Sequence, residues 1–78
     1  MADLVLYGTE SCHLCEEAEQ LLVQFGLDFE KQDIIEDPQL QQRYGLRIPV
    51  LLHAASACEL NWPFDEDGLR EFLAQVSN

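Results

Sequence analysis

The segment Gly8-Thr9-Glu10-Ser11-Cys12-His13-Leu14-Cys15 decides the fold, because two different patterns of hydrophobicity meet in it. The apolar run Leu4-Val5-Leu6-Tyr7 before it predicts a strand over residues 3–7 that is buried on both faces. We expect Ser11 to cap a helix after this strand and Gly26 to end that helix. Apolar side chains then recur about every 3.6 residues, at Leu14, Ala18, Leu21, Leu22 and Phe25. The two cysteines therefore lie across the first turn of the predicted helix.

The spacing of Cys12 and Cys15 predicts redox chemistry. Two cysteines in the first turn of a helix can bring their sulfurs within bonding distance, and the helix N-terminus stabilises a thiolate there. The alternative is a pair of buried helix cysteines without chemical use, which their position directly after a strand disfavours. We therefore predict reversible dithiol–disulfide exchange, with His13 as an exposed residue between the cysteines and with His13 and Leu14 tuning the potential.

A zinc site would need two further ligands beside this pair. The other candidates, His13, His53 and Cys58, repeat neither the Cys-x-x-Cys nor the His-x-x-x-His spacing, so we predict no metal site. Cys58 is interpreted as a buried strand residue rather than a third redox centre, because free cysteine packs as a small hydrophobe. An iron–sulfur cluster shared between two chains stays open as an alternative, although nothing in the spacing requires one.

The bulk composition limits the classes of partner. A chain of 78 residues has room for one domain, residues 1–78, which we expect to be a monomer. Its formal net charge of -11 would repel nucleic acid and anionic membrane surfaces, so neither is a predicted partner. The same field favours a protein partner with a positive patch over an anionic metabolite.

The first residues predict a cytoplasmic protein. They include no basic segment, and the apolar run is too short for a signal peptide or a membrane span. In a reducing cytosol, three cysteines indicate catalysis, metal binding or plain burial rather than a framework of structural disulfides. The odd number supports this interpretation, because one cysteine must stay unpaired.

The rest of the chain alternates between strand and helix patterns. Residues 28–35 predict an edge strand that includes Ile34 and Ile35, and Asp37-Pro38 opens a short helix that ends at Gly45. A strand over residues 47–52 and a hairpin partner over residues 58–60 follow. Asp65 is expected to cap a last helix, with Trp62-Pro63-Phe64 packed before it and an apolar face of Leu69, Phe72, Leu73 and Val76.

The predicted order is β-α-β-α-β-β-α, which is an α/β class. A right-handed crossover makes the first two strands parallel, and a short connection makes the last two antiparallel. The result is a four-stranded mixed sheet flanked by three helices.

These residues together resemble the glutaredoxin branch of the thioredoxin-like fold. The resemblance rests on the strand-turn-Cys-x-x-Cys-helix unit, the Asp37-Pro38 helix, Ile48-Pro49-Val50 at the start of a strand and the capped last helix. The His-Leu between the cysteines and Trp-Pro-Phe-Asp at residues 62–65 look like a small bacterial glutaredoxin-like family of unassigned function. The resemblance implies that Cys12 is the nucleophile and Cys15 the resolving thiol. It also implies that Pro49 is a cis proline facing them, and that the backbone of Ile48 pairs with substrate.

The chain departs from typical glutaredoxins in the parts that hold glutathione. His13-Leu14 replaces the usual Pro-Tyr, the lysine common just upstream is absent, and no Gly-Gly precedes the last helix. Arg47, and after it Arg43, are the residues left to meet a glutathione carboxylate. Glutathione is therefore a candidate reductant rather than a required one.

We conclude from the sequence that the chain is a glutaredoxin-like disulfide reductase and dithiol electron carrier in cell redox homeostasis, with no bound cofactor. Its substrate would be a protein or small-molecule disulfide, and its reductant glutathione or a protein reductase. The first alternative is a non-catalytic module of the same fold that binds a partner protein through the proline loop. The second is a metal or iron–sulfur carrier that uses Cys12.

Overall fold

The structure, a computed structural model, describes residues 3–76. Its elements in chain order are β1 (Leu4–Gly8), α1 (His13–Gln24), β2 (Phe29–Asp33), the 3₁₀ helix η1 (Ile34–Glu36), α2 (Pro38–Tyr44), β3 (Val50–His53), β4 (Cys58–Asn61) and α3 (Glu66–Val76).

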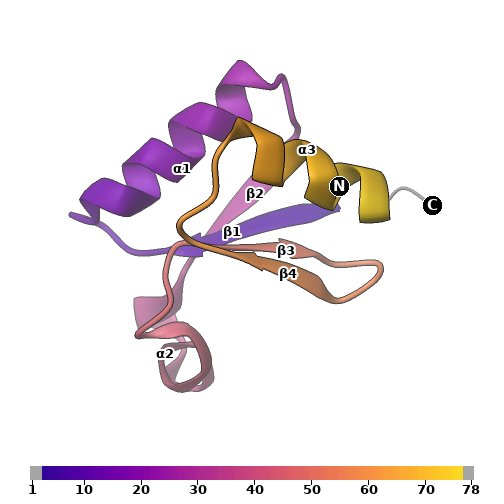
Figure 1. The fold of residues 1–78 in the computed structure, drawn as a ribbon. Coiled ribbons are helices and arrows are strands. Elements are labelled where there is room, and N and C mark those ends of the chain that lie inside the picture. The colour runs from indigo at the N-terminus through magenta and orange to yellow at the C-terminus, as the bar shows by residue number, and fades with distance from the viewer. Residues whose placement is uncertain (1–2, 77–78) are drawn as a thin grey trace.

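The four strands form one mixed sheet in the order β2-β1-β3-β4 (Figure 1). β1 and β2 are parallel, and α1 makes the crossover that a parallel pair requires. β1 pairs antiparallel with β3, and β3 with β4. The predicted fold class and both strand orientations are confirmed.

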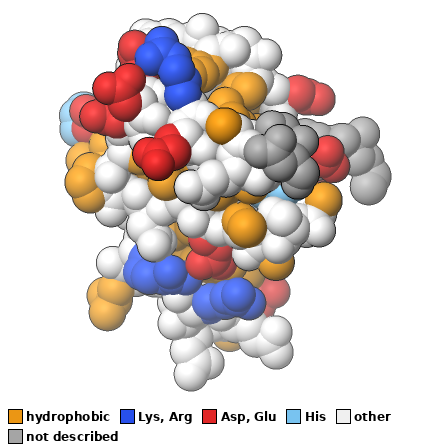
Figure 2. Space-filling model, turned by 45° about the vertical axis from the view of Figure 1, so that its right-hand side comes forward, with side chains coloured by type: hydrophobic (Ala, Val, Ile, Leu, Met, Phe, Trp, Pro, Cys, Tyr) orange, Lys and Arg blue, Asp and Glu red, His pale blue; other side chains and the backbone are white. Residues whose placement is uncertain are grey.

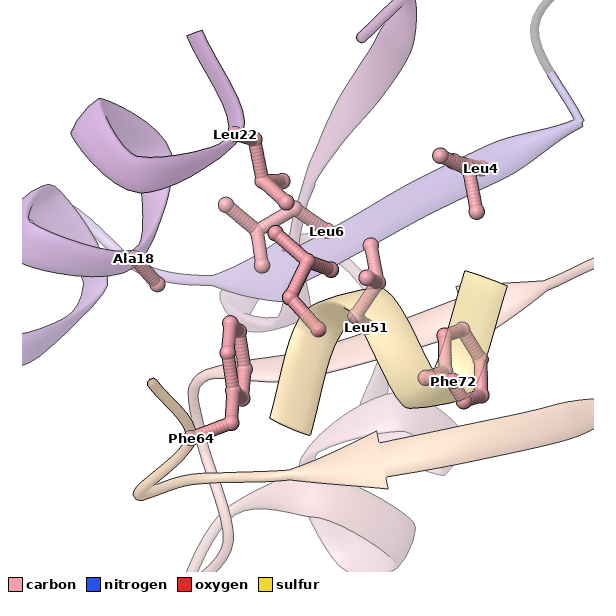
Figure 3. Packing of buried hydrophobic residues seen from close by; sticks show 8 residues of the cluster. Leu4, Leu6, Ala18, Leu22, Leu51, Phe64 and Phe72 are labelled. Carbon is pink, nitrogen blue, oxygen red and sulfur yellow. The ribbon is translucent and has the colours of Figure 1, made fainter. Parts of the chain in front are cut away.

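Helices cover both faces of the sheet, with α1 and α3 on one face and α2 on the other (Figure 1). The main core fills the space between the sheet and helices α1 and α3 (Figure 3). Its buried members are Leu4, Leu6, Ala18, Leu22, Leu51, Phe64, Leu69 and Phe72. A smaller core of Ile34, Tyr44 and Val50 lies on the α2 face. Burial of this apolar surface is the main favourable term in the folding of so small a domain.

The two ends of α1 follow different rules. At the C-terminal end the prediction is confirmed: Gly26 has a φ of +69°, and the N–H groups of Gly26 and Leu27 donate to the carbonyls of Val23 and Leu22. At the N-terminal end the predicted cap is wrong. Ser11 has a φ of 63°, which is incompatible with the extended backbone of a capping residue, and Cys12 is the N-cap.

Leu14 does not join the apolar face of α1 as predicted. Its side chain is 45% exposed, whereas Ala18 and Leu22 on the same helix are fully buried. Figure 1 shows the reason, since the start of α1 extends beyond the end of the sheet and has no strand beneath it.

The edge strand is shorter than predicted. β2 ends at Asp33, whose carboxylate accepts the N–H of Ile35 at 2.9 Å and starts η1. Ile34 is buried and Ile35 is exposed within this single turn. A side chain that accepts the backbone N–H two residues on replaces the strand ladder here.

The predicted α2 is confirmed at both ends. The Asp37 carboxylate accepts the N–H of Gln39 at 2.8 Å, Pro38 occupies the first turn, and Gly45 follows the last helical residue. Tyr44 at its C-terminal end is buried against the second core.

The segment that leads into β3 is irregular rather than extended. The predicted strand over residues 47–52 begins only at Val50, because the N–H groups of Arg47 and Ile48 both donate to the carbonyl of Tyr44. The cis bond predicted at Ile48-Pro49 is confirmed. A second cis bond, at Trp62-Pro63, was not predicted.

The start of α3 combines a cap with an apolar contact. The Asp65 carboxylate accepts the N–H of Gly68 at 2.8 Å, as predicted. Phe64, just before the cap, and Leu69, in the following turn, belong to the same core, which is the arrangement of a hydrophobic staple. Among residues 3–76, no helix has the length and apolar character needed to cross a membrane.

We predict that Asp65→Ala lowers the free energy of unfolding by about 1 kcal/mol, because the first turn of α3 loses its side-chain acceptor. Asp28→Ala is the matched control, since Asp28 is exposed in the loop between α1 and β2 and should change stability by less than about 0.5 kcal/mol. Urea unfolding followed by circular dichroism measures both. Equal midpoints for the two variants would contradict the capping role.

Candidate redox site

Cys12 and Cys15 form a disulfide at the start of α1, with their Cα atoms 5.2 Å apart. Cys12 is the N-cap residue and half-buried, whereas Cys15 lies in the first turn and is 8% exposed. The more accessible of the two cysteines is therefore Cys12, which the family resemblance assigned as nucleophile.

The backbone around Cys12 is arranged to stabilise negative charge. The N–H of Cys15 donates to the Cys12 sulfur at 3.1 Å, in the position where a serine or aspartate oxygen usually caps a helix. The positive end of the α1 dipole points to the same atom. After reduction, these groups favour the thiolate of Cys12 over the thiol.

Gly8 leaves room for the second cysteine. A Cβ atom at this position would lie 3.0 Å from the Cys15 sulfur and 3.1 Å from its Cβ. These distances are shorter than normal van der Waals contacts, so a larger residue at the end of β1 would push Cys15 away. In the sequence, Gly8 gives no signal of this contact and looks only like a turn residue.

An acidic groove of about 480 Å³ lies beside Cys15. Its wall brings together the dithiol turn, the start of α1 and the end of β2, with carboxylates from Glu10, Glu16, Glu19, Asp33 and Glu36. Lys31 is the basic residue in this wall, and its ammonium group pairs with Glu19 at 3.2 Å. The groove therefore carries negative potential next to the dithiol and disfavours anions there.

The two residues between the cysteines point into solvent. The His13 side chain is 85% exposed, with its ring nitrogens 4.0 Å from Glu16 and 3.7 Å from Glu17. Leu14 beside it is also exposed. The exposure predicted for His13 is confirmed, and its effect on the potential stays a prediction.

The proline loop lies at the same end of the sheet as the dithiol. Tyr7 is paired with Val50 in the antiparallel register of β1 and β3, so Pro49 and Gly8 are the next residues along their two strands. Pro49 is fully buried and Ile48 packs against the second core. The register thus brings together two of the segments that the sequence analysis placed in the site.

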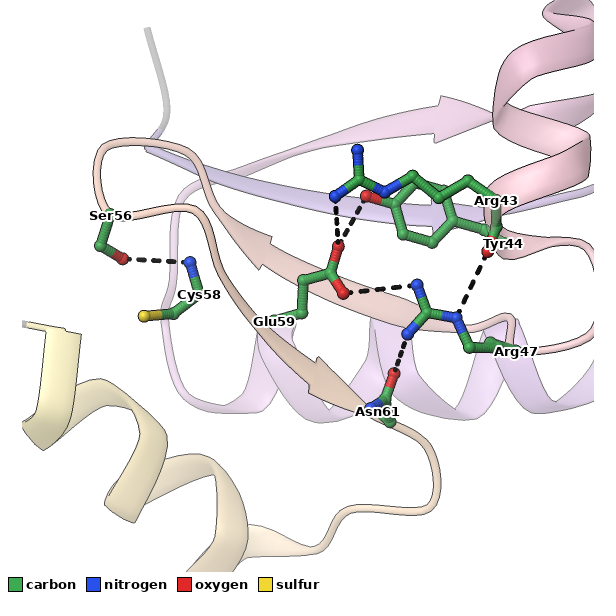
Figure 4. A network of polar contacts seen from close by, with 7 residues as sticks. All are labelled: Arg43, Tyr44, Arg47, Ser56, Cys58, Glu59 and Asn61. Carbon is green, nitrogen blue, oxygen red and sulfur yellow. Dashed lines mark hydrogen bonds and ion pairs between the residues drawn. The ribbon is translucent and has the colours of Figure 1, made fainter.

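The Arg47 side chain already has hydrogen-bond and aromatic partners within the folded chain. Its guanidinium donates to Glu59 at 3.3 Å and to Asn61 at 3.2 Å, and it lies over the ring of Tyr44 (Figure 4). Arg43 also pairs with Glu59, at 3.7 Å. Glu59 was not singled out in the sequence, where one glutamate in a short strand carries no distinguishing signal.

Tyr44 links this polar cluster to the core. Its hydroxyl donates to the Glu59 carboxylate at 2.7 Å, and its ring stacks on Tyr7 with centroids 4.5 Å apart. Burial, and then the hydrogen bond to Glu59, raise the pKa of Tyr44 to about 12.

The remaining candidates lie elsewhere. The burial predicted for Cys58 is wrong, because this cysteine is exposed. Cys58 pairs with His53, which pairs with Leu4, so Cys58 lies at the end of the sheet opposite the dithiol, roughly 13 Å away along a strand. Among residues 3–76, no group of three or more His, Cys, Asp or Glu side chains is placed to hold a metal ion.

A dithiol at a helix N-terminus, beside a cis proline on a β-α-β-α-β-β-α sheet, defines a protein of the thioredoxin-like class. Within that class, the chain belongs to the family described as "Glutaredoxin-like domain (DUF836)", whose model matches residues 3–74. The family predicted from the sequence motifs is confirmed. No curated protein matches the chain.

Solved structures place the chain among similar small proteins. The target protein XcR50 from X. campestris is 41% identical, with a TM-score of 0.86 and coverage of 92% of this chain and 96% of that chain. Protein Ne2328 from Nitrosomonas europaea is 33% identical, with a TM-score of 0.71 and coverage of 91% and 89%. The glutaredoxin (grx-1) from Archaeoglobus fulgidus is 21% identical, with a TM-score of 0.68 and coverage of 94% and 87%, and it shares the fold alone.

We predict that the tyrosine titration of the native protein contains a step with a pKa of about 12, which Tyr44→Phe removes. Because the folded-state pKa is raised above the ordinary 10.0, the Tyr44 hydroxyl contributes stability that is fully present below pH 10. That contribution is lost as the pH rises to about 12. Absorbance of the tyrosinate band, read with intact protein, measures the step. Ionisation of both tyrosines together near 10 would show that the Tyr44–Glu59 bond is absent in solution.

Proposed function

We propose that the protein is a thiol–disulfide oxidoreductase that carries electrons on the Cys12–Cys15 dithiol. The observation that carries this proposal is the disulfide at the N-terminus of α1, with Cys12 as the more accessible cysteine. An amide N–H directed at Cys12 supports its role as nucleophile.

The reaction has two exchange steps. The Cys12 thiolate attacks one sulfur of the substrate disulfide, so that a mixed disulfide forms and the other substrate half leaves as a thiolate. Cys15 then loses its proton and attacks the Cys12 sulfur, which releases the second half. Two electrons pass from the dithiol to the substrate, the released thiolates take up protons, and the Cys12–Cys15 disulfide remains.

The burial of Cys15 supports this order. A thiol that is 8% exposed is poorly placed to meet an external disulfide but lies one helical turn from the mixed disulfide on Cys12. Gly8 leaves room for the Cys15 side chain there. Cys15 is therefore the resolving residue.

The proline loop would orient the substrate. In the related fold the residue before the cis proline pairs its backbone with the substrate, and Ile48 occupies that place here. Because the Ile48 N–H already donates to the Tyr44 carbonyl, we expect the Ile48 carbonyl to accept an N–H from the substrate. Such a pairing suits a peptide disulfide, and Pro49 and Arg47 flank it.

The cycle needs an external reductant to restore the dithiol. Glutathione or a protein reductase in the cytoplasm would supply the two electrons by the same exchange chemistry in reverse. The acidic groove next to Cys15 favours a reductant with a positively charged surface over a free anionic thiol.

We predict that Cys12→Ser abolishes the reduction of a disulfide substrate, because the attacking sulfur is lost. Cys15→Ser should instead accumulate a covalent mixed disulfide at Cys12, because the resolving step is removed. Cys58→Ser is the matched control and should keep full turnover, since Cys58 lies at the far end of the sheet. Mass spectrometry after an acid quench measures the covalent species.

The result that would contradict the proposal is specific. If Cys12→Ser turned over substrate as fast as the wild type, Cys12 would not be the nucleophile. If Cys15→Ser formed no adduct under oxidising conditions while the wild type was active, the two sulfurs would not divide the work as proposed.

A further inference from the structure

Every basic side chain of the chain is already paired with a carboxylate. The four pairs or groups are Lys31 with Glu19, Arg43 with Glu59, Arg47 with Glu59, and Arg70 with Glu66 and Asp67. The space-filling view shows the few basic groups lying next to acidic ones (Figure 2). An incoming carboxylate would therefore compete with an internal one at each of these four cations.

Arg47 is the cation next to the proline loop. It precedes Ile48-Pro49, and the register of β1 and β3 sets Pro49 next to Gly8 at the start of the dithiol turn. Asn61, which binds the Arg47 guanidinium, is paired with Val50 at the same end of the sheet. A disulfide held at the Ile48 backbone would bring its neighbouring groups towards Arg47.

Glu59 is held firmly in front of both arginines. One carboxylate oxygen accepts from Arg47 at 3.3 Å, and the other accepts from the Tyr44 hydroxyl at 2.7 Å and pairs with Arg43 at 3.7 Å (Figure 4). The Glu59 side chain is only 18% exposed, whereas those of Arg43 and Arg47 are 69% and 39% exposed.

The Glu59 carboxylate is already in position before a substrate binds. Tyr44 is fixed by its stack on Tyr7 and by burial, so the hydroxyl that orients Glu59 does not have to be ordered on binding. A substrate carboxylate would have to displace an acceptor that is tethered to the same sheet and satisfied by three donors. An intramolecular competitor of this kind acts at a high effective concentration.

We propose that Glu59 is a specificity-determining residue that occupies Arg43 and Arg47, the cations that precede the proline loop, and so selects against disulfides that carry carboxylates. The substrates that remain favoured are disulfides with neutral or positively charged surroundings. This inference rests on the proposed function and names its substrate class. The carboxylates of the groove on the other side of Cys15 act in the same direction.

The test uses three small disulfides of similar size and different charge: dithiodiglycolate (anionic), hydroxyethyl disulfide (neutral) and cystamine (cationic). Reduced protein is mixed with each disulfide, and the reaction is quenched with acid. The free thiols are then alkylated and the protein mass is measured by mass spectrometry, so that no recycling enzyme is needed. Each rate is divided by the rate of the same disulfide with dithiothreitol, which removes differences in intrinsic reactivity.

We expect Glu59→Gln to raise the anionic-to-neutral ratio of rates about three- to tenfold, because both guanidinium groups lose their internal carboxylate. The double variant Glu59→Gln with Arg47→Gln should lose most of this gain, since the freed cation is then absent. The glutamine is isosteric and keeps an acceptor for Tyr44.

Glu30→Gln is the matched control. Glu30 pairs across to Val5, Val5 to Leu52, and Leu52 to Glu59, so the two glutamates lie in one row on opposite edges of the sheet. Both variants remove one negative charge at the same height along the strands. The ratio should change less than about twofold in Glu30→Gln, because the global charge contributes little at this range in salt.

The outcomes separate this inference from the proposed function. An unchanged ratio in folded Glu59→Gln, with all three disulfides reduced by the wild type, overturns the role of Glu59 alone. If Glu59→Gln fails to fold, the wild-type protein alone can still contradict the inference. An anionic-to-neutral ratio of rates above one at low salt would show that the protein does not select against anionic disulfides. A wild type that reduces none of the three overturns the proposed function and this inference together.

Discussion

The antiparallel pairing of β1 with β3 is the constraint on which the rest of the structure depends. On one face of this pair, Leu6 and Leu51 lie opposite each other in the main core, and on the other face Tyr7 and Val50 meet the side chains of α2. One residue beyond the last pair, the chain leaves β1 at Gly8 and enters β3 from Pro49. The same hydrogen-bond register that closes the core thus brings the dithiol turn and the proline loop together.

Slippage of this register would affect core and site at once. A shift of one residue would move Leu51 to the α2 face and separate Pro49 from Gly8. Burial of leucine side chains at 0% to 7% exposure on the α1 and α3 face resists such a shift. In this fold, hydrophobic packing therefore positions the candidate redox site.

The second feature of the site is the negative charge around the dithiol. The chain has fifteen acidic and four basic residues, and the fold concentrates several of the acidic ones around Cys15. The helix N-terminus stabilises a Cys12 thiolate locally, whereas the groove carboxylates oppose it over a longer range. The N–H of Cys15 contacts the Cys12 sulfur directly, whereas the groove carboxylates also act on the charge of an approaching molecule.

The sequence predicted those parts of the fold that depend on local patterns. The caps at Asp37 and Asp65, the stop at Gly26 and the order of helices and strands along the chain each follow from local patterns, and the structure confirms them. Two of the errors concern burial and share a different cause. Leu14, predicted to join the helix face, overhangs the sheet, and Cys58, predicted to be buried, lies at an open edge, both of which depend on where the elements end in space.

The sequence likewise predicted some residues of the candidate site and missed others. Cys12, Cys15 and the cis bond before Pro49 were accessible from spacing and from family resemblance. Glu59 and the Tyr44 hydroxyl were not, because their importance arises from contacts of Glu59 with Arg47 and Tyr44, which lie 12 and 15 positions earlier in the sequence. Only the folded register reveals that the expected carboxylate-binding arginine already has a carboxylate.

The most direct test of the account is a redox titration of the dithiol. The protein is equilibrated with defined ratios of reduced and oxidised glutathione, its free thiols are alkylated, and the mass shift at Cys12 and Cys15 is measured, with Cys58 as an internal reference for a free thiol. The account predicts a single two-electron transition of this pair with a midpoint between roughly -280 and -180 mV. Persistence of two free thiols at every ratio, with no internal disulfide, would contradict it.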